Sequence, residues 1–353
     1  MTRTFKNFSS TLLLVCTLAA LTGCEPLGAP DAAPKPTRLY VSSSAAGTGN
    51  QKVDVFDAAD AAAPSITRSI QSGNTEGVWV DTESNILIHA GSKAFAASPS
   101  PTVKFYANST TVDSNAAPTS QFTDTLLTNA REITFDDVRK SLYIANQTKN
   151  EIRIYDNAPS LTGNVTASRV LTLPDDPWSV FYDRKSDRLF IAFDTGSDSI
   201  YIYNNPQLKN GNAAPDKVLR LKTTYNTNAQ RRLHNAWYSN KLDVLYVTDV
   251  GNGSPDSADG SVYVVEQLAT VLATATTAAP VTPTRTITGL ATLLKNPTDV
   301  DVDDRDGRED IYISEKAGAK ILVFKFGATG NAAPAKTFPH PSPEDIFLDI
   351  FTP

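Results

Sequence analysis

The sequence predicts an all-β chain folded into a six-bladed β-propeller, and repeated strand patterns carry the prediction. Six short runs of β-branched and aromatic residues occur along the chain: RLYVSSS from Arg38, NILIHAG from Asn85, SLYIANQ from Ser141, RLFIAFD from Arg188, VLYVTDV from Val244 and DIYISEK from Asp310. Each is followed by a second run in which apolar and variable residues alternate: KVDVFD, TVKFYA, EIRIYD, SIYIYN, SVYVVE and KILVFK. Such alternation is typical of strands with two different faces.

Two further strands complete each unit. A short apolar run precedes five of the LYV-type strands: EGVWVD, REITFD, WSVFYD, NAWYSN and TDVDVD. After the alternating strand comes a loop that often ends in AAP, as at Pro64, Pro118, Pro215 and Pro334. Proline there fixes the entry into a last, more polar strand such as DKVLRL. Four strands in about 50 residues is the period of a propeller blade.

The strand count predicts how the ring closes. The first unit lacks its initial strand, whereas the chain end supplies a surplus one, EDIFLD. Pairing the two would remove the edges that an open array exposes. A β-sandwich or a solenoid is the alternative interpretation, and HAGSKAFAASPSP in the second unit is irregular enough to hold an insertion.

The N-terminus has the pattern of a processing segment. Arg3 and Lys6 precede an apolar run that is too short to span a membrane as a mature helix, and Thr22 and Gly23 lead to Cys24. The string LTGC resembles the lipobox of bacterial lipoproteins. The resemblance implies cleavage of residues 1–23, lipidation of Cys24 and stable anchoring by two or three acyl chains. The alternative is a plain secretory signal with a chance cysteine.

Composition agrees with export and anchoring. Residues 24–37 are rich in Pro and Ala and predict an extended tether to a propeller of residues 38–353. Cys16 lies in the segment expected to be removed, so no disulfide is expected. The net charge of -6 argues against nucleic acid as a partner. We expect a cell-envelope protein held to the membrane by its N-terminal lipid, in the outer membrane where the organism has one, because Glu25 follows the cysteine where inner-membrane retention is associated with aspartate.

The repeats resemble those of NHL-type six-bladed propellers. The resemblance covers the chain from Thr37 onward and rests on PTDVDVD at Pro297–Asp303, PEDIFLD at Pro343–Asp349 and the LYV-type strands. The glycines common after the second strand in that family are mostly absent here. The resemblance implies architecture more than activity, because propellers host several enzyme classes and pure binding platforms.

Catalytic signatures are missing from the sequence. It contains no HExxH, GxSxG, GxxxxGK[ST] or CxxC motif. The three histidines, His89, His234 and His340, fall in different blade strands, which disfavours a zinc site. One arginine and one tryptophan in the expected channel are too few for a quinone cofactor.

The expected site is the channel mouth where the inner strands start. Aligning those strands predicts one ring of Glu76, Arg131, Trp178, Asn235, Thr298 and Glu344, with His234 beside it. The next ring is predicted to hold Gly77, Glu132, Ser179, Ala236, Asp299 and Asp345. The arrangement loosely resembles calcium-dependent lactonases, and that resemblance implies Ca²⁺ ligands at Glu76, Asn235, Asp299 and Glu344. The alternative is a solvated rim without a dedicated ligand.

Two other parts of the sequence are candidates for a functional site. The acidic stretch 299–310 partly matches a calcium loop through Asp304, Asp306 and Asp310, although Val302 replaces the first ligand and a charged turn is the default. The loops 251–260 and 269–284 exceed what a hairpin needs, and the Thr/Ala/Pro content of the second favours disorder or an exposed flap.

Together these features favour an envelope-anchored binding or scaffold module for a protein or glycan partner, without catalysis and without a cofactor. The alternative is a calcium-dependent lactonase-type hydrolase at the channel mouth. Convergence of oxygen ligands from at least four blades would distinguish them.

Replacing Cys24 by Ser tests the anchor. We expect the variant to leave the membrane fraction and to keep the melting temperature of the wild type, because only the acyl acceptor is lost. Fractionation followed by immunoblotting measures this. A Ser variant that still sediments with membranes would contradict lipidation at Cys24.

Overall fold

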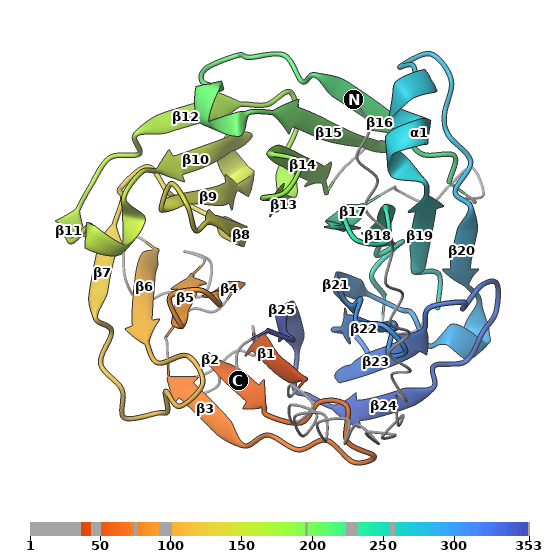
Figure 1. Cartoon of the computed structure of the whole chain (residues 1–353), viewed down its shortest axis with the longest axis horizontal. Coiled ribbons are helices and arrows are strands. Elements are labelled where there is room, and N and C mark those ends of the chain that lie inside the picture. Colours follow the sequence, from red (N-terminus) through yellow and green to blue (C-terminus); the bar gives the residue numbers. More distant parts are fainter. Residues whose placement is uncertain are drawn as a thin grey trace, which may run out of the picture. The chain divides into compact units, whose positions relative to one another are not determined.

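The computed structural model describes residues 37–43, 51–71, 73, 76–91, 101–194, 197–223, 232–254 and 258–351. The predicted signal segment, Cys24 and the tether up to residue 36 lie outside the described residues, as do residues 92–100 of the irregular stretch in the second unit. Six antiparallel sheets surround a centre, and strands β4, β8, β13, β17, β21 and β25 lie innermost (Figure 1). The prediction of a six-bladed propeller is therefore confirmed.

The blades contain the following strands. Blade 1 is β25 (Pro343–Asp349), β1 (Arg38–Ser43), β2 (Lys52–Phe56) and β3 (Arg68–Gln71). Blade 2 is β4 (Gly77–Asp81), β5 (Ile86–Ala90), β6 (Thr102–Ala107) and β7 (Ser120–Thr123), with β11 (Gly163–Asn164) added at its edge. Blade 3 is β8 (Ala130–Asp136), β9 (Ser141–Asn146), β10 (Glu151–Tyr155) and β12 (Arg169–Thr172).

The remaining three blades follow the same order without additions. Blade 4 is β13 (Pro177–Asp183), β14 (Arg188–Phe193), β15 (Ser199–Asn204) and β16 (Lys217–Arg220). Blade 5 is β17 (Leu233–Ser239), β18 (Val244–Asp249), β19 (Ser261–Glu266) and β20 (Arg285–Thr288). Blade 6 is β21 (Pro297–Asp303), β22 (Asp310–Glu315), β23 (Lys320–Lys325) and β24 (Lys336–Pro339).

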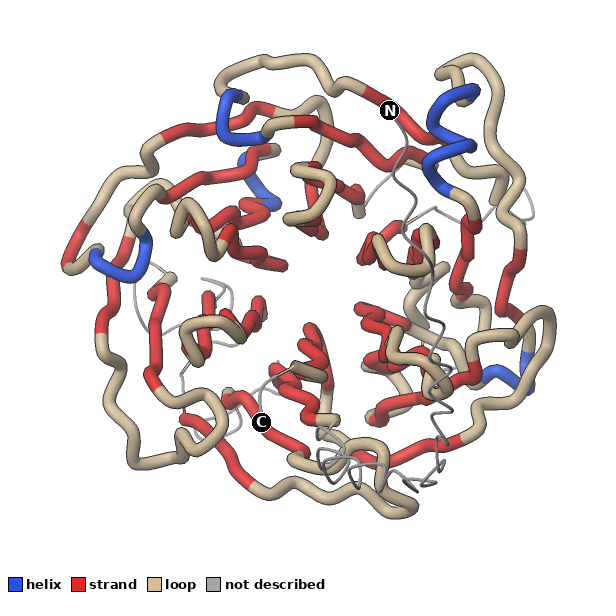
Figure 2. Tube along the Cα trace, in the orientation of Figure 1, coloured by secondary structure: helices blue, strands red, loops and turns tan. Residues whose placement is uncertain are grey.

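Helices among the described residues are short and lie in the connections between strands (Figure 2). They are η2 (Gln147–Lys149), η3 (Ala158–Ser160), η4 (Pro206–Leu208), α1 (Leu268–Thr274) and η5 (Leu290–Thr292). Within the described part of the chain, no helix has the length and apolar character needed to cross a membrane.

The C-terminal strand closes the ring, as predicted. Strand β25 pairs antiparallel with β1, and Arg38 lies opposite Asp349 in that register. Arg38 is buried, and its guanidinium contacts the Asp349 carboxylate at 2.9 Å and that of Asp57 at 2.8 Å. A charge-assisted hydrogen bond of this kind adds orientation to the strand pairing. The first and last ordered strands are therefore joined by backbone and side chains together.

The core lies between neighbouring blades rather than at one centre. One cluster joins Ile200 and Leu219 of blade 4 to Tyr263 and Val265 of blade 5. Because a second strand has a blade on each side, both of its faces are covered, and β1 and β9 are buried at every position. This double burial explains why the LYV-type runs are apolar without alternation.

The AAP loops have a structural role that the sequence did not reveal. Gly211 and Gly330 lie at φ +58° in the loops before β16 and β24, and each pairs in parallel with the outer strand of the preceding blade. The Gly211 N–H donates to Val170 at 2.7 Å, and the Gly330 N–H donates to Thr286 at 2.7 Å. These contacts cover outer edges that could otherwise pair with another chain.

The prediction of disorder or an exposed flap in residues 269–284 is wrong in its first part. Helix α1 begins just before this segment, and its Leu268 and Leu272 side chains are buried in the cluster between blades 4 and 5. Val281 pairs with Leu221 of blade 4. Composition favoured disorder, but two leucines at helical spacing supply an apolar face that docks. Residues 255–257 of the other long loop lie outside the described residues.

The closure contact gives a stability prediction. In Asp349→Ala, buried Arg38 loses one of its two carboxylate partners, so we expect the free energy of unfolding to fall by about 3 kcal/mol. Urea unfolding of the purified protein measures the change. Asp306→Ala, which removes a solvent-exposed pairing with Lys241, is the control and should leave the unfolding midpoint in place. Equal stability of Asp349→Ala and wild type would contradict a role of this pair in closure.

Candidate functional site

The predicted mouth lies where the inner strands start, and the structure corrects one register there. Ser179, Asn235 and Asp299 occupy equivalent positions, because they pair with Ala192, Thr248 and Ser314 at the fifth place of the second strand. Asn235 therefore belongs to the second ring, and His234 takes its place in the first. Proline marks the start of this strand in blades 4, 6 and 1, whereas blade 5 begins it with leucine. Without that marker, the sequence alignment placed blade 5 one residue out of register.

A β-bulge turns the first-ring side chains toward the channel. The pairing shifts register between Pro177 and Ser179, between Leu233 and Asn235, and between Pro297 and Asp299, which leaves the intervening residue unpaired. Bulges of this kind re-aim a side chain at a strand end. The corrected first ring is Glu76, Arg131, Trp178, His234, Thr298 and Glu344.

Ion pairs and stacked rings close this mouth. Arg131 contacts Glu76 at 3.0 Å and lies 4.0 Å over the Trp178 ring. Trp178 in turn stacks on His234, with ring centroids 3.7 Å apart. Glu344 of the same ring pairs with Lys316. Four predicted site residues thus contact one another in a chain, Glu76, Arg131, Trp178 and His234, whereas Glu344 binds a lysine outside the predicted set.

Asp194, which the sequence interpretation missed, anchors the His234 side of this network. Its carboxylate accepts hydrogen bonds from Arg232 and His234 at 2.8 Å and from Gln147 at 2.9 Å. Burial lowers the pKa of His234 to about 4, so the imidazole is neutral at pH 7. Asp194 and Gln147 follow second strands, whose ends lie beside the starts of inner strands. The polar residues that end the LYV-type runs were the available signal.

The second ring places carboxyl groups in the interior of the channel. The free edge of each inner strand carries backbone N–H groups, and side chains of the preceding blade accept from them. Asp345 accepts from the N–H of Val78 at 2.7 Å, and Asp299 accepts from that of Ile346 at 2.6 Å. Glu132 instead accepts from the Asn235 amide at 3.0 Å.

Burial raises the pKa of these carboxyl groups. It raises the pKa of Asp299 to about 6 and those of Glu132 and Asp345 well above their ordinary value. The negative charge of Asp299 adds to the effect of burial on both neighbours. These carboxyl groups are buried because they accept N–H groups at the strand edges, so their raised pKa values do not by themselves indicate catalysis.

Space for a ligand is lacking at the predicted mouth. The cavity bordered by Glu76, Trp178, Asp299 and Glu344 has a volume of about 10 Å³, on the scale of one water molecule. Among the described residues, no three His, Cys, Asp or Glu side chains are grouped so that they could hold a metal ion. Of the four residues that the lactonase resemblance implied, Glu76 and Glu344 pair with cations and Asn235 with Glu132.

The acidic stretch 299–310 covers the end of β21, the turn at residues 304–309 and the first residue of β22. Asp304 accepts from the Ser239 hydroxyl at 2.7 Å, while Asp306 and Asp310 pair with Lys241 at 2.8 Å and Lys325 at 2.6 Å. The three carboxylates thus have different partners. Equivalent aspartates at other inner-strand ends, such as Asp136, accept the N–H groups of their turns.

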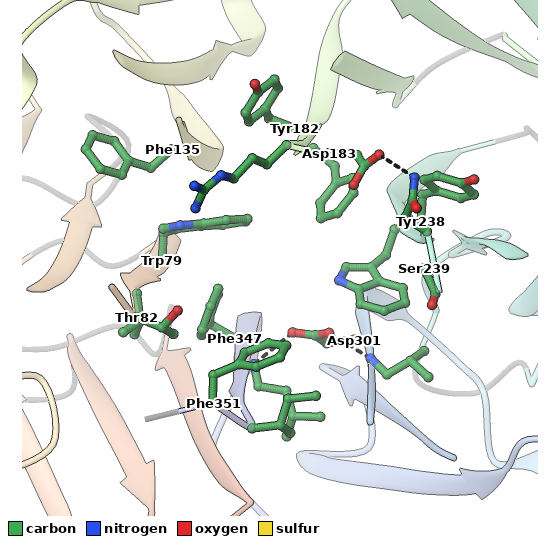
Figure 3. Close-up of a pocket in the computed structure, with 18 of the residues that line it drawn as sticks. Trp79, Thr82, Phe135, Tyr182, Asp183, Tyr238, Ser239, Asp301, Phe347 and Phe351 are labelled. Atoms are coloured by element: carbon green, nitrogen blue, oxygen red, sulfur yellow. Dashed lines mark hydrogen bonds between the residues drawn. The ribbon is translucent and has the colours of Figure 1, made fainter. Parts of the chain in front are cut away.

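A large cavity lies at the opposite end of the channel, where the inner strands finish. Its volume is about 670 Å³. Counting along each inner strand from the first-ring residue, the fourth position of five blades borders this cavity. The fourth-position ring consists of Trp79, Thr134, Phe181, Trp237, Asp301 and Phe347. Figure 3 shows Asp301 and the rings of Trp79 and Phe347 around the same space. We call this space the aromatic cavity.

The four aromatic rings contact one another around the cavity. The centroid separations are 5.0 Å from Phe347 to Trp79, 6.3 Å from Trp79 to Phe181 and 5.9 Å from Phe181 to Trp237. The sequence contained a sign of this cavity, because the residue at the fourth ring position is aromatic in four of the six units. It was missed because the start of the inner strands was taken as the site.

Asp301 is the charged group at the inner wall of the aromatic cavity. It is only 7 % exposed, and its carboxylate accepts the N–H of Leu348 at 2.8 Å and that of Val302 at 2.7 Å. Burial raises its pKa well above the ordinary value, and the neighbouring carboxylates Asp299 and Asp304 raise it further. The sequence interpretation had placed Asp301 only within an acidic turn segment.

The fold and the channel define the chain as a six-bladed β-propeller. Among solved structures, the periplasmic gluconolactonase of Pseudomonas aeruginosa is similar, with a TM-score of 0.59, 10% identity, and coverage of 88% of this chain and 98% of that one. A Bacteroides fragilis protein assigned as a 6-phosphogluconolactonase gives 0.59 and 10%, covering 91% and 100%. A chain of a nidogen/laminin complex gives 0.57 and 11%, covering 88% and 97%. At these identities the likeness shows the fold alone. No family model and no curated protein matches the chain.

The raised pKa of Asp299 gives a pH-dependent prediction. A carboxyl whose pKa is higher in the folded state stabilises the protein at low pH, and this stability is lost as the pH rises toward about 6. Asp299→Asn carries no charge and keeps one acceptor oxygen, so one of the Val300 and Ile346 N–H groups loses its acceptor at every pH. From pH 4.5 to pH 7.5 we expect its free energy of unfolding relative to the wild type to rise by about 2 kcal/mol. Urea unfolding at both pH values measures the gap.

Asp306→Asn is the matched control for this experiment. It removes an exposed carboxylate whose pKa the pairing with Lys241 lowers, so its stability relative to the wild type should not rise with pH. A constant gap between Asp299→Asn and wild type would show that the Asp299 pKa is not raised.

Proposed function

We propose that this protein is a non-enzymatic binding module of the cell envelope, anchored through Cys24, and that the aromatic cavity holds its ligand. The observation that carries the proposal is the contrast between the two ends of the channel. One end is closed by paired charges, and the other opens into about 670 Å³ bordered by aromatic rings. Ligand pockets commonly have this volume and combine aromatic walls with polar groups that fix the orientation of the ligand.

The border of the cavity suits a ligand with both apolar and polar parts. The rings of Trp79 and Trp237 are half-buried, so each keeps a face for contact. Around the opening lie Asp183, Asn240 and Lys241. Rings of this kind stack on apolar faces, including the C–H faces of sugars, while the rim supplies hydrogen bonds. A glycan, or a side chain of a protein partner, meets both conditions.

A calcium-dependent lactonase remains the alternative. Two similar structures are named as gluconolactonases, but their identity to this chain is 10%, which carries the fold and not the activity. Such an enzyme would need several oxygen ligands free to converge on one ion. In the described channel Glu76, Glu344 and Asn235 are engaged with other side chains. The binding function is therefore the better supported of the two.

A ligand panel tests the proposal on the purified protein. Its members are a neutral oligosaccharide such as chitotetraose, choline, benzoate and calcium chloride, and the measurements are melting temperature and titration calorimetry. We expect at least one organic member to bind and to raise the melting temperature. In Thr82→Trp, an indole at the rim should reduce that affinity at least about tenfold, because it occupies the opening.

The matched control is Val138→Trp, an exposed position in the equivalent turn of blade 3 that does not border the cavity. Its affinity should equal that of the wild type. The proposal fails if no organic member binds, or if Thr82→Trp leaves the affinity of the bound member unchanged. Stoichiometric calcium with a melting shift that Thr82→Trp leaves unchanged would favour the lactonase alternative.

A further inference from the structure

We propose that the aromatic cavity recognises the alkylated ammonium group of a small organic cation, seated among the four rings and against Asp301. The inference rests on the proposed function and names the chemical class of ligand for the same site. It follows from three features of the cavity: the arrangement of the rings, the isolation of the Asp301 carboxylate, and the charge of the border.

The rings form an incomplete cage. Phe347, Trp79, Phe181 and Trp237 follow one another around the channel with centroid separations of 5.0 to 6.3 Å. The face of each ring carries partial negative charge, so several rings around one space attract a cation more than a neutral group. Tryptophan is the most favourable ring for this contact, and the cage contains two.

Asp301 adds a buried carboxyl group to the cage, and a cationic ligand beside it would favour the ionised form of that group. No cation among the described residues pairs with it, although buried carboxylates usually have such a partner. Its two oxygens accept only the N–H groups of Val302 and Leu348. A cationic ligand would supply the missing countercharge.

The border of the cavity has an acidic excess. Six carboxyl side chains and two cations lie along it: Asp81, Glu83, Asp137, Asp183, Asp301 and Asp304, with Arg184 and Lys241. Both cations are paired with acids, Arg184 with Asp137 and Lys241 with Asp306, and Asp81 pairs with Lys140 beside the border. The excess therefore comes from the carboxyl groups without an ion pair among the described residues, which are Asp183, Asp301 and Asp304. The field at the opening therefore favours a positive ligand and disfavours an anion.

Alkylation of the ammonium follows from the aromatic neighbours of Asp301 in the cage. A primary ammonium carries three N–H donors that need partners when buried. Among the side chains at the fourth ring position, Asp301 lies between Trp237 and Phe347, and its carboxyl group already accepts two backbone N–H groups. An alkylated ammonium has few or no N–H donors, and its methyl groups pack against the rings. The cavity volume leaves room for a larger body attached to this group.

The test compares choline with two analogues in titration calorimetry on the purified protein. The first analogue, 3,3-dimethylbutan-1-ol, has the shape of choline without its charge, and the second, ethanolamine, has the charge without the methyl groups. We expect each analogue to bind at least about tenfold more weakly than choline. Asp301→Asn should weaken choline at least about tenfold and leave the affinity for 3,3-dimethylbutan-1-ol unchanged.

Asp310→Asn, which removes a carboxylate of the same blade that does not border the cavity, is the control and should change choline affinity less than about threefold. The melting temperature of each variant shows that it is folded. Phe347→Leu, which removes one ring of the cage, provides a second variant and should also weaken choline.

The outcomes separate this inference from the proposed function. Equal binding of choline and either analogue, or full affinity in Asp301→Asn, overturns the inference. If chitotetraose or benzoate binds in a manner sensitive to Thr82→Trp while choline does not bind, the proposed function stands and the ligand class is wrong. If no organic compound binds, both fail.

Discussion

The pairing of β25 with β1 is the constraint on which the rest of the structure depends. A blade contacts only its two neighbours, so without closure the first and last blades would each expose an apolar face and a strand edge. Closure also packs Leu39 and Phe56 of blade 1 against Ile321 and Phe338 of blade 6. Only in a closed ring do the six inner strands converge on one channel, and both ends of that channel are consequences of this convergence.

Convergence creates a second requirement, because each inner strand keeps one unpaired edge. The acceptors for its N–H groups come from the preceding blade, and short side chains with oxygen atoms meet the need. Ser179 and Thr134 do so without charge, whereas Asp299, Asp301 and Asp345 bring carboxyl groups into the buried channel. The raised pKa values follow from that burial. Acidic residues in the channel thus serve first as acceptors for backbone N–H groups at the unpaired strand edges.

The fold was largely predictable from the sequence, because strand periodicity is local and repeats six times. Every blade has its four predicted strands, and the surplus run EDIFLD closes the ring. The register of blade 5 was wrong by one residue where Leu233 replaces the proline marker. Which end of the channel is open could not be predicted, since it depends on contacts between residues far apart in the sequence. Lys316 reaches Glu344, and Arg232 reaches Asp194.

The difference between the two ends follows from what the inner strand carries at each position. First-ring side chains such as Arg131, Trp178 and Glu344 are long, and they interlock into pairs and stacks that fill the opening. At the fourth position, flat rings from four blades alternate with the small side chains of Thr134 and Asp301. The four rings are tilted against one another and the other two side chains are short, and about 670 Å³ remains between them. The result is a cavity with an aromatic border and one buried carboxyl group. Its chemistry follows from the residues at one position of the repeated inner strand.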